Sequence, residues 1–112
     1  MWPRIGITTS PDVINDRPHD TLNRAYVDAV VRAGGAPILI PVLEPALVDA
    51  MLGGLDGIIL SGGSDIDPAT YHEMPDPSVY GVNEGRDAWE IALACTAIER
   101  GVPLLAICWR AQ

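Results

Sequence analysis

Short apolar runs alternate along this chain with segments whose apolar residues recur at helical spacing. The apolar runs predict β-strands at residues 4–10, 36–42, 56–60 and 102–108. The last run is entered through Gly101 and Pro103 and is apolar throughout. Such a run is typical of a strand that is buried on both faces of a parallel sheet.

Three segments between the runs have the three- and four-residue spacing of helices. The first begins at a cap formed by Asp20 or Thr21 and ends at Gly34. The second starts at Pro45, and the third covers residues 86–100 and ends at the next glycine. Each predicted helix has one apolar face. In the first helix it comprises Leu22, Ala25, Tyr26, Ala29, Val30 and Ala33. In the second it comprises Leu47, Val48, Met51 and Leu52, and in the third Trp89, Ala92, Leu93, Thr96 and Ala97.

Two stretches lack either pattern. Residues 11–20 hold prolines, Asp and Asn, which predicts a loop after the first strand. Residues 68–85 include Pro75, Pro77 and Gly81 and predict a long irregular excursion. Excursions of this length in compact domains are usually functional or mobile, and the sequence leaves open whether this one closes over a site as a lid.

The resulting order, β-α-β-α-β-loop-α-β, predicts parallel strands joined by right-handed crossovers. We expect an α/β fold, a flavodoxin-like parallel sheet with helices on both faces and the strand order 2-1-3-4. With about four strands this sheet would be incomplete. The chain has 112 residues, enough for one domain at most.

Composition narrows the classes of function. Hydrophobic residues make up 48% of the chain and charged residues 20%, which is a globular composition. Fifteen acidic and seven basic side chains give a net charge of −8, so we expect no nucleic acid partner. No G-x-G-x-x-G turn follows the first strand, which argues against a nucleotide-binding domain.

The lengths of the apolar runs also indicate where in the cell the protein is expected. No run approaches the roughly 20 residues that a membrane span needs, and the first residues lack a signal-peptide core. We therefore expect a cytoplasmic protein without a membrane partner. Cys95 and Cys108 are then expected to be free thiols, and His19 and His72 lie far apart in loop-like sequence. We expect neither a metal nor another cofactor.

Cys108 is the strongest candidate for chemistry because it ends the last predicted strand. Ligands of open α/β sheets collect at the carboxyl ends of the strands. A thiol there, followed by a helix start, would have its pKa lowered toward the reactive thiolate by backbone N–H groups. The alternative is a small core side chain, since free cysteines are usually buried. Cys95, near Ile91 and Ile98 on the predicted third helix, is expected to pack.

Gly62 and Gly63 directly follow the third predicted strand. Two glycines there can direct a backbone N–H into a cleft, as an oxyanion hole requires, or they can form an ordinary tight turn. Ser61 and Ser64 beside them lack the G-x-S-x-G context of a nucleophilic serine.

Charged residues near this turn have two readings each. Asp65 and Asp67 could bind a cation, but alternating aspartates are also common in turns that bond their own backbone. Arg86 and Asp87 could meet an anion at the mouth of the long excursion, or supply the charge and cap of a helix start.

A resemblance to a known family rests on motifs in four segments. Residues 33–37 read AGGAP, residues 55–68 LDGIILSGGSDIDP, residues 85–87 GRD and residues 102–108 VPLLAIC. In this order and spacing they resemble the class I glutamine amidotransferase superfamily, in particular its gamma-glutamyl-gamma-aminobutyrate hydrolase branch. The resemblance covers essentially the whole chain.

The resemblance implies a cysteine-dependent hydrolase that acts on γ-glutamyl amides. Cys108 would be the nucleophile on a strand-to-helix elbow and would form a thioester that water resolves. Gly62 or Gly63, with the backbone amide of Trp109, would form the oxyanion hole. The substrate would be a small γ-glutamyl compound, and the residues that bind it are not assigned.

The chain departs from the family pattern in two ways. Arg110 stands where the family elbow has a glycine, and neither His19 nor His72 matches the family's catalytic histidine, which lies well after the elbow. Since family members are roughly twice as long, we expect residues 1–112 to be the amino-terminal half of such a domain. The alternative is a truncated remnant or interaction module without turnover. The strand at residues 102–108 would then be an exposed edge prone to self-association.

Overall fold

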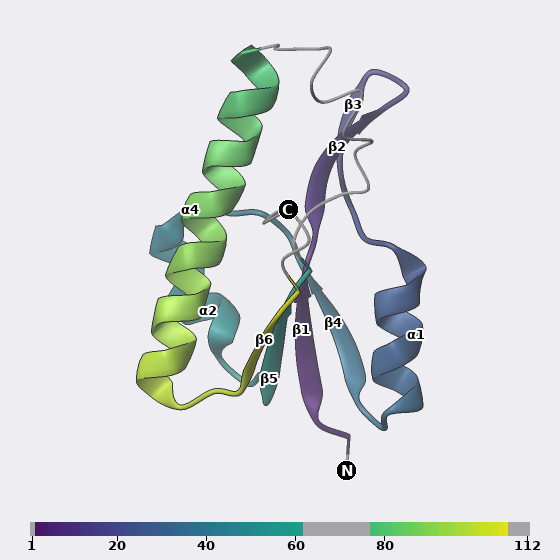
Figure 1. The fold of residues 1–112 in the computed structure, drawn as a ribbon, viewed down its shortest axis with the longest axis vertical. Coiled ribbons are helices and arrows are strands. Elements are labelled where there is room, and N and C mark those ends of the chain that lie inside the picture. Colours follow the sequence, from purple (N-terminus) through teal and green to yellow (C-terminus); the bar gives the residue numbers. More distant parts are fainter. Residues whose placement is uncertain (1, 62–76, 108–112) are drawn as a thin grey trace.

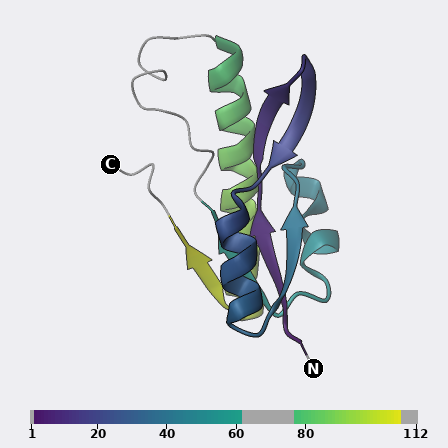
Figure 2. The same cartoon turned by 90° about the vertical axis from the view of Figure 1, so that its right-hand side faces the viewer.

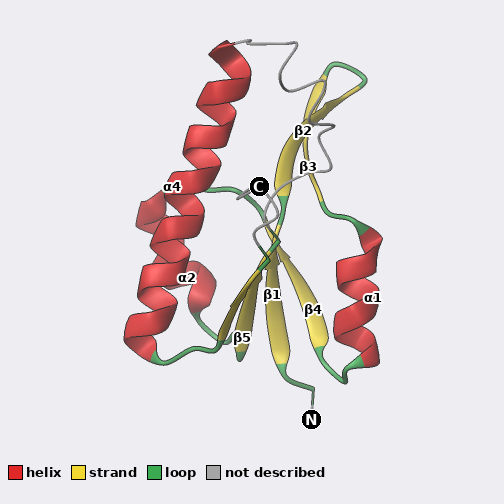
Figure 3. Ribbon diagram, in the orientation of Figure 1, coloured by secondary structure: helices red, strands yellow, loops and turns green. Residues whose placement is uncertain are grey.

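A computed structural model describes residues 2–61 and 77–107, with the backbone alone described for residues 77–84. These residues form both strands and helices (Figure 3). The elements are β1 (Arg4–Thr8), β2 (Ser10–Ile14), β3 (Arg17–Thr21), α1 (Arg24–Arg32), β4 (Ala36–Ile40), the 3-10 turn η1 (Pro45–Leu47), α2 (Val48–Leu52), β5 (Gly57–Leu60), α4 (Pro77–Arg100) and β6 (Leu104–Ala106).

Four strands form one parallel sheet in the order β4-β1-β5-β6 (Figure 1). Counted along the chain without the β2–β3 pair, this is the predicted order 2-1-3-4, which is confirmed. β1 is central and pairs with β4 on one side and β5 on the other. The α/β class with a partial flavodoxin-like sheet is therefore also confirmed.

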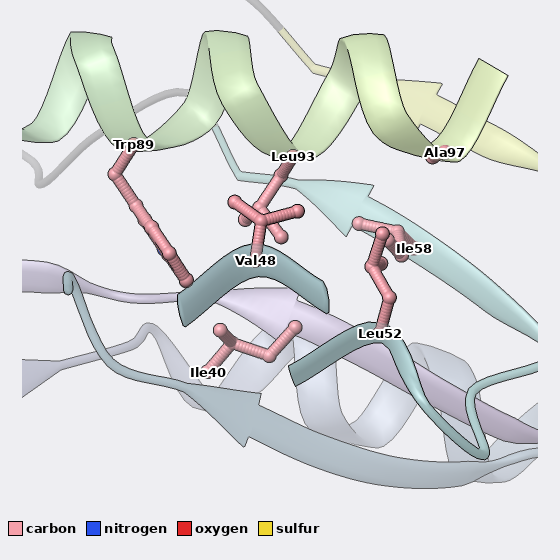
Figure 4. Packing of buried hydrophobic residues seen from close by; sticks show 7 residues of the cluster. All are labelled: Ile40, Val48, Leu52, Ile58, Trp89, Leu93 and Ala97. Atoms are coloured by element: carbon pink, nitrogen blue, oxygen red, sulfur yellow. The ribbon is translucent and has the colours of Figure 1, made fainter. Parts of the chain in front are cut away.

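Helices cover both faces of the sheet. α1 lies against one face beside β4, and α2 and α4 lie against the other (Figures 1 and 2). The main core fills the space between the sheet, α2 and α4 (Figure 4). Its buried residues are Ile40, Val48, Leu52, Ile58, Trp89, Leu93 and Ala97. The predicted apolar face of the third helix is thus confirmed at Trp89, Leu93 and Ala97.

The loop predicted for residues 11–20 is wrong, because β2 and β3 form an antiparallel hairpin there. Asn15 and Asp16 form its two-residue turn, with φ angles of 53° and 61°. Positive φ at both central residues matches the twist of a hairpin, and Asn and Asp tolerate that conformation. Pro11 and Pro18 fit because both strands of a two-stranded ribbon are edges. The first strand accordingly ends at Thr8.

The first two helices differ in detail from their predictions. The cap of α1 is Asn23, whose Oδ1 accepts from the Ala25 amide at 2.9 Å, and not Asp20 or Thr21, which lie in β3. The segment from Pro45 begins as the turn η1, so Leu47 is 40% exposed and does not join the apolar face of α2.

The long excursion predicted for residues 68–85 is partly wrong. Residues 68–76 lie outside the described residues, but α4 already begins at Pro77. Proline is tolerated in the first turn of a helix, where its missing N–H would have no partner. Gly81 lowers helix propensity by about 1 kcal/mol without blocking the helix.

The last predicted strand is shorter and more exposed than expected. β6 covers Leu104–Ala106, lies at the edge of the described sheet, and leaves Leu105 57% exposed, so burial on both faces is wrong. The packing expected for Cys95 is wrong as well. Cys95 is exposed, with Ile91 and Ile98, because these residues share the side of α4 that faces away from the sheet.

Candidate functional site

The carboxyl ends of β5 and β6 lie next to each other. The two strands pair in parallel, and the Ile107 amide donates to the Leu60 carbonyl at 2.9 Å, which extends the pairing beyond β6. Ser61 follows β5 directly. Two chain segments therefore leave neighbouring strands at the same edge of the sheet, one after Ser61 and one after Ile107.

The predicted site residues come next in the sequence. Gly62 and Gly63 follow Ser61, while Cys108 and Trp109 follow Ile107, and all four lie outside the described residues. Asp65, Asp67, His72 and Arg110 lie outside them as well. The roles expected for these residues stay predictions. The last described residues before them, Ser61 and Ile107, follow neighbouring strands at the same edge of the sheet.

Ser61 is fixed by hydrogen bonds at each of its polar groups and is 1% exposed. Its amide donates to Thr8 Oγ1 at 3.0 Å, and its hydroxyl donates to the Thr8 carbonyl at 2.8 Å. Its own carbonyl accepts from the Tyr26 hydroxyl of α1 at 3.0 Å. The end of β5 is thereby tied to β1 and to α1.

Arg86 reaches the same place from α4 and is 3% exposed. Its Nη1 donates to Ser10 Oγ at 2.8 Å, and its Nη2 donates to Ser61 Oγ at 3.2 Å. Nη2 also lies 3.5 Å from Glu90 Oε2, one turn further along the helix. Glu90 in turn accepts from Thr8 Oγ1 at 2.6 Å.

This cluster of Thr8, Ser10, Ser61, Arg86 and Glu90 is a buried polar network at the carboxyl edge of the sheet. A buried guanidinium requires an opposite charge and hydrogen bonds, and the network supplies both. The helix-start reading of Arg86 is wrong, because the residue lies well inside α4. The reading in which Arg86 meets an anion at the loop mouth stays a prediction, since most of that loop lies outside the described residues.

Most of the network was missed from the sequence. The visible signals were three consecutive hydroxyl residues at the end of the first strand, Thr8, Thr9 and Ser10, and an Arg-x-x-x-Glu pair at helical spacing. The helical spacing predicts Tyr26 only as an apolar position, whereas its hydroxyl donates to the Ser61 carbonyl.

Other features of the described residues bear on the site. His19 lies in β3 and is exposed, with its Nδ1 2.9 Å from the Arg17 carbonyl oxygen. Within residues 2–61 and 77–107, no three His, Cys, Asp or Glu side chains gather as metal ligands would. No helix in that part of the chain combines the length and apolar character needed to cross a membrane.

The fold and the position of the candidate site define the class of protein. It is an α/β protein with a partial flavodoxin-like parallel sheet, and its candidate site lies where the neighbouring strands β5 and β6 end. The family model for Peptidase C26 matches residues 3–112. The chain belongs to this family, which is of the class I glutamine amidotransferase type, and the resemblance noted from the sequence is confirmed.

Relatives among curated proteins agree. The chain is 39% identical over 113 residues to Protein NtpR of Enterococcus hirae, covering 96% of this chain and 47% of that protein. It is 36% identical over 109 residues to the gamma-glutamyl-gamma-aminobutyrate hydrolase PuuD of Escherichia coli K12, covering 95% of this chain and 42% of that protein. The chain thus spans less than half the length of these relatives.

Proposed function

We propose that this chain is the amino-terminal part of a cysteine-dependent hydrolase of γ-glutamyl amide bonds. The observation that carries the proposal is the pairing of Ile107 with Leu60, at the point where the segments bearing Cys108 and Gly62 leave the sheet. The name of a relative, a gamma-glutamyl-gamma-aminobutyrate hydrolase, supports the γ-glutamyl group as the substrate's reacting part.

In the proposed reaction, the Cys108 thiolate attacks the γ-carbonyl carbon and a sulfur–carbon bond forms. The carbonyl oxygen becomes an oxyanion that backbone amides of Gly62 or Gly63 and Trp109 would stabilise. The carbon–nitrogen bond then breaks, the amine leaves with a proton, and a γ-glutamyl thioester remains. Water hydrolyses the thioester to glutamate and the free thiol. No cofactor takes part.

A second candidate is a chain without turnover of its own. It is favoured by the histidines of these 112 residues, because neither His19 nor His72 matches the catalytic histidine expected from the resemblance. Loss of a general base typically lowers a rate by about 10²–10⁴-fold. The nucleophile could then still be acylated, whereas the thioester would not be released.

One experiment separates these candidates. The 112-residue chain is incubated with a γ-glutamyl 4-nitroanilide, and 4-nitroaniline release and the mass of the protein are followed together. Cys108→Ala removes the proposed nucleophile, and Cys95→Ser, at an exposed thiol on α4, is the matched control. Continuous release that needs Cys108 supports the hydrolase, and one stable γ-glutamyl adduct on Cys108 supports the second candidate. No release and no adduct would overturn both roles for Cys108.

A further inference from the structure

Ser61 is the last described residue before the two glycines to which the proposed function assigns the oxyanion hole. Its amide, hydroxyl and carbonyl are all hydrogen-bonded, and the residue is buried. A glycine pair has wide conformational freedom, so the direction of its N–H groups depends on how the preceding residue is held. The contacts that hold Ser61 therefore influence the direction of the backbone N–H groups of Gly62 and Gly63.

Arg86 contacts Ser61 from α4, whereas the other side-chain contacts to Ser61 come from β1 and α1. It joins α4 to the Ser61 hydroxyl after β5 and to the Ser10 hydroxyl at the start of β2. A guanidinium can do this because its planar fork presents several N–H donors in fixed directions, whereas a lysine ammonium is a compact point charge. The planar shape of the guanidinium, as well as its charge, therefore allows Arg86 to bond both hydroxyls.

Glu90 sets the direction of the guanidinium. Its Oε2 lies 3.5 Å from Arg86 Nη2 and accepts from Thr8 Oγ1, the same hydroxyl that accepts the Ser61 amide. One threonine oxygen therefore connects the carboxylate to the backbone of Ser61. A displacement of Glu90 would be transmitted to Ser61 through Thr8, and a displacement of Arg86 directly through its bond to the Ser61 hydroxyl.

We propose that Arg86, oriented by Glu90, is a positioning residue that fixes Ser61 and thereby the direction in which the chain enters Gly62 and Gly63. This inference rests on the proposed function, since it matters for catalysis only if those glycines donate to an oxyanion. Arg86 acts through Ser61 and touches no reacting atom, so its contribution is geometric.

The test compares two reactions of the Cys108 thiol in the 112-residue chain carrying Cys95→Ser. Acylation by a γ-glutamyl 4-nitrophenyl ester forms an oxyanion before 4-nitrophenolate leaves. Alkylation by iodoacetamide displaces iodide directly and forms none. Loss of one oxyanion-hole donor typically costs about 10²–10³-fold, so we expect Arg86→Lys and Ser61→Ala to slow acylation by about 10–100-fold. Alkylation should stay within about twofold, because it needs no such donor.

Arg100→Lys is the matched control, because Arg100 lies on the same helix as Arg86 and pairs at the surface with Asp49 of α2. It should change neither rate. Thermal unfolding of each variant reports whether the fold is intact, and Ser61→Ala, which keeps the backbone bonds of Ser61, serves if Arg86→Lys fails to fold. Equal slowing of acylation and alkylation, or unchanged acylation in both variants, would overturn the positioning role.

Absence of any acylation in the unmutated chain would instead contradict the proposed function. The positioning of Ser61 is then decided by amide hydrogen exchange. We expect exchange at the Ser61 amide to be at least about tenfold faster in Arg86→Lys than in Arg100→Lys, because local opening governs such exchange. Equal exchange in the two variants would show that Arg86 does not hold Ser61.

Discussion

The hydroxyl of Thr8 donates to Oε2 of Glu90 at 2.6 Å and accepts the Ser61 amide at 3.0 Å. This single group joins the end of β1 to α4 and to the end of β5. Polar contacts therefore connect the carboxyl ends of β1 and β5 to α4, while the apolar core packs the sheet against α2 and α4. The two parts should respond differently to mutation.

Replacement of Glu90 by alanine should be strongly destabilising. It would remove the Glu90 carboxylate from beside the Arg86 guanidinium, whose side chain is only 4% exposed. Removal of one partner of a buried ion pair costs about 3–5 kcal/mol, so we expect a loss of this size in the free energy of unfolding by urea. Asp49→Ala, at a 76% exposed carboxylate paired with Arg100, should cost about 1 kcal/mol or less. Equal losses in the two variants would contradict this account.

The network also shows where prediction from the sequence ends. Thr8 and Glu90 are 82 residues apart, and Ser10 and Arg86 are 76 apart. Nothing in the local pattern indicates that these residues meet, because hydrophobic periodicity reports burial of apolar side chains and not hydrogen bonding between distant elements. The sequence indicates Arg86 as a candidate residue, but the burial of its side chain depends on the tertiary fold.

The order of the strands in the sheet was predictable because it follows from the pattern of apolar residues along the chain. Each of its strands is an apolar run, and the segments between them carry helical periodicity over their buried face, as at Trp89 and Leu93. The hairpin of β2 and β3 was not predictable in this way, since it lies outside the core and Val13 is 69% exposed. Its prolines and its Asn15-Asp16 turn are equally typical of a loop.

Truncation of Leu93 should remove a central part of the core. Leu93 is fully buried and points from α4 toward Val48 of α2 (Figure 4). Replacement of a buried leucine by alanine costs about 2–5 kcal/mol through lost burial and a remaining cavity, and urea unfolding should show a loss in this range. Ile98→Ala, on the outer side of the same helix and 69% exposed, should change stability by about 0.5 kcal/mol or less. A comparable loss at Ile98 would mean that the outer side of α4 is covered in solution.

Addition of a methyl group at Gly6 should be unfavourable. A Cβ there would lie 2.5 Å from Ile40 Cδ1 and 2.8 Å from Leu55 Cδ1, and Ile40 is 1% exposed and cannot move freely. Overpacking of this kind costs about 1–3 kcal/mol, and we expect Gly6→Ala to lower the unfolding free energy by that amount.

Gly85→Ala is the matched control for the same methyl group in open space. Among the described residues, no atom beyond the chain neighbours and the backbone of the helix itself lies within 4 Å of the added Cβ, and the residue is inside α4. Alanine is favoured over glycine in a helix by about 0.8–1.0 kcal/mol, so urea unfolding should show a gain of about this size. A loss at Gly85 would contradict the helical position of this residue.

The edge strand β6 should cause the chain to self-associate. It lies at the end of the described sheet, and Leu105 and Ile107 are 57% and 36% exposed. An apolar edge with unpaired backbone groups is a template for pairing with another strand. We expect sedimentation velocity at micromolar concentration to show oligomers, and Leu105→Lys to shift them toward monomers. Ile91→Lys adds the same charge on the exposed side of α4 and should leave the oligomers in place. A single monomer boundary for the unmutated chain, or dissociation by Ile91→Lys alone, would exclude the β6 edge as the interface.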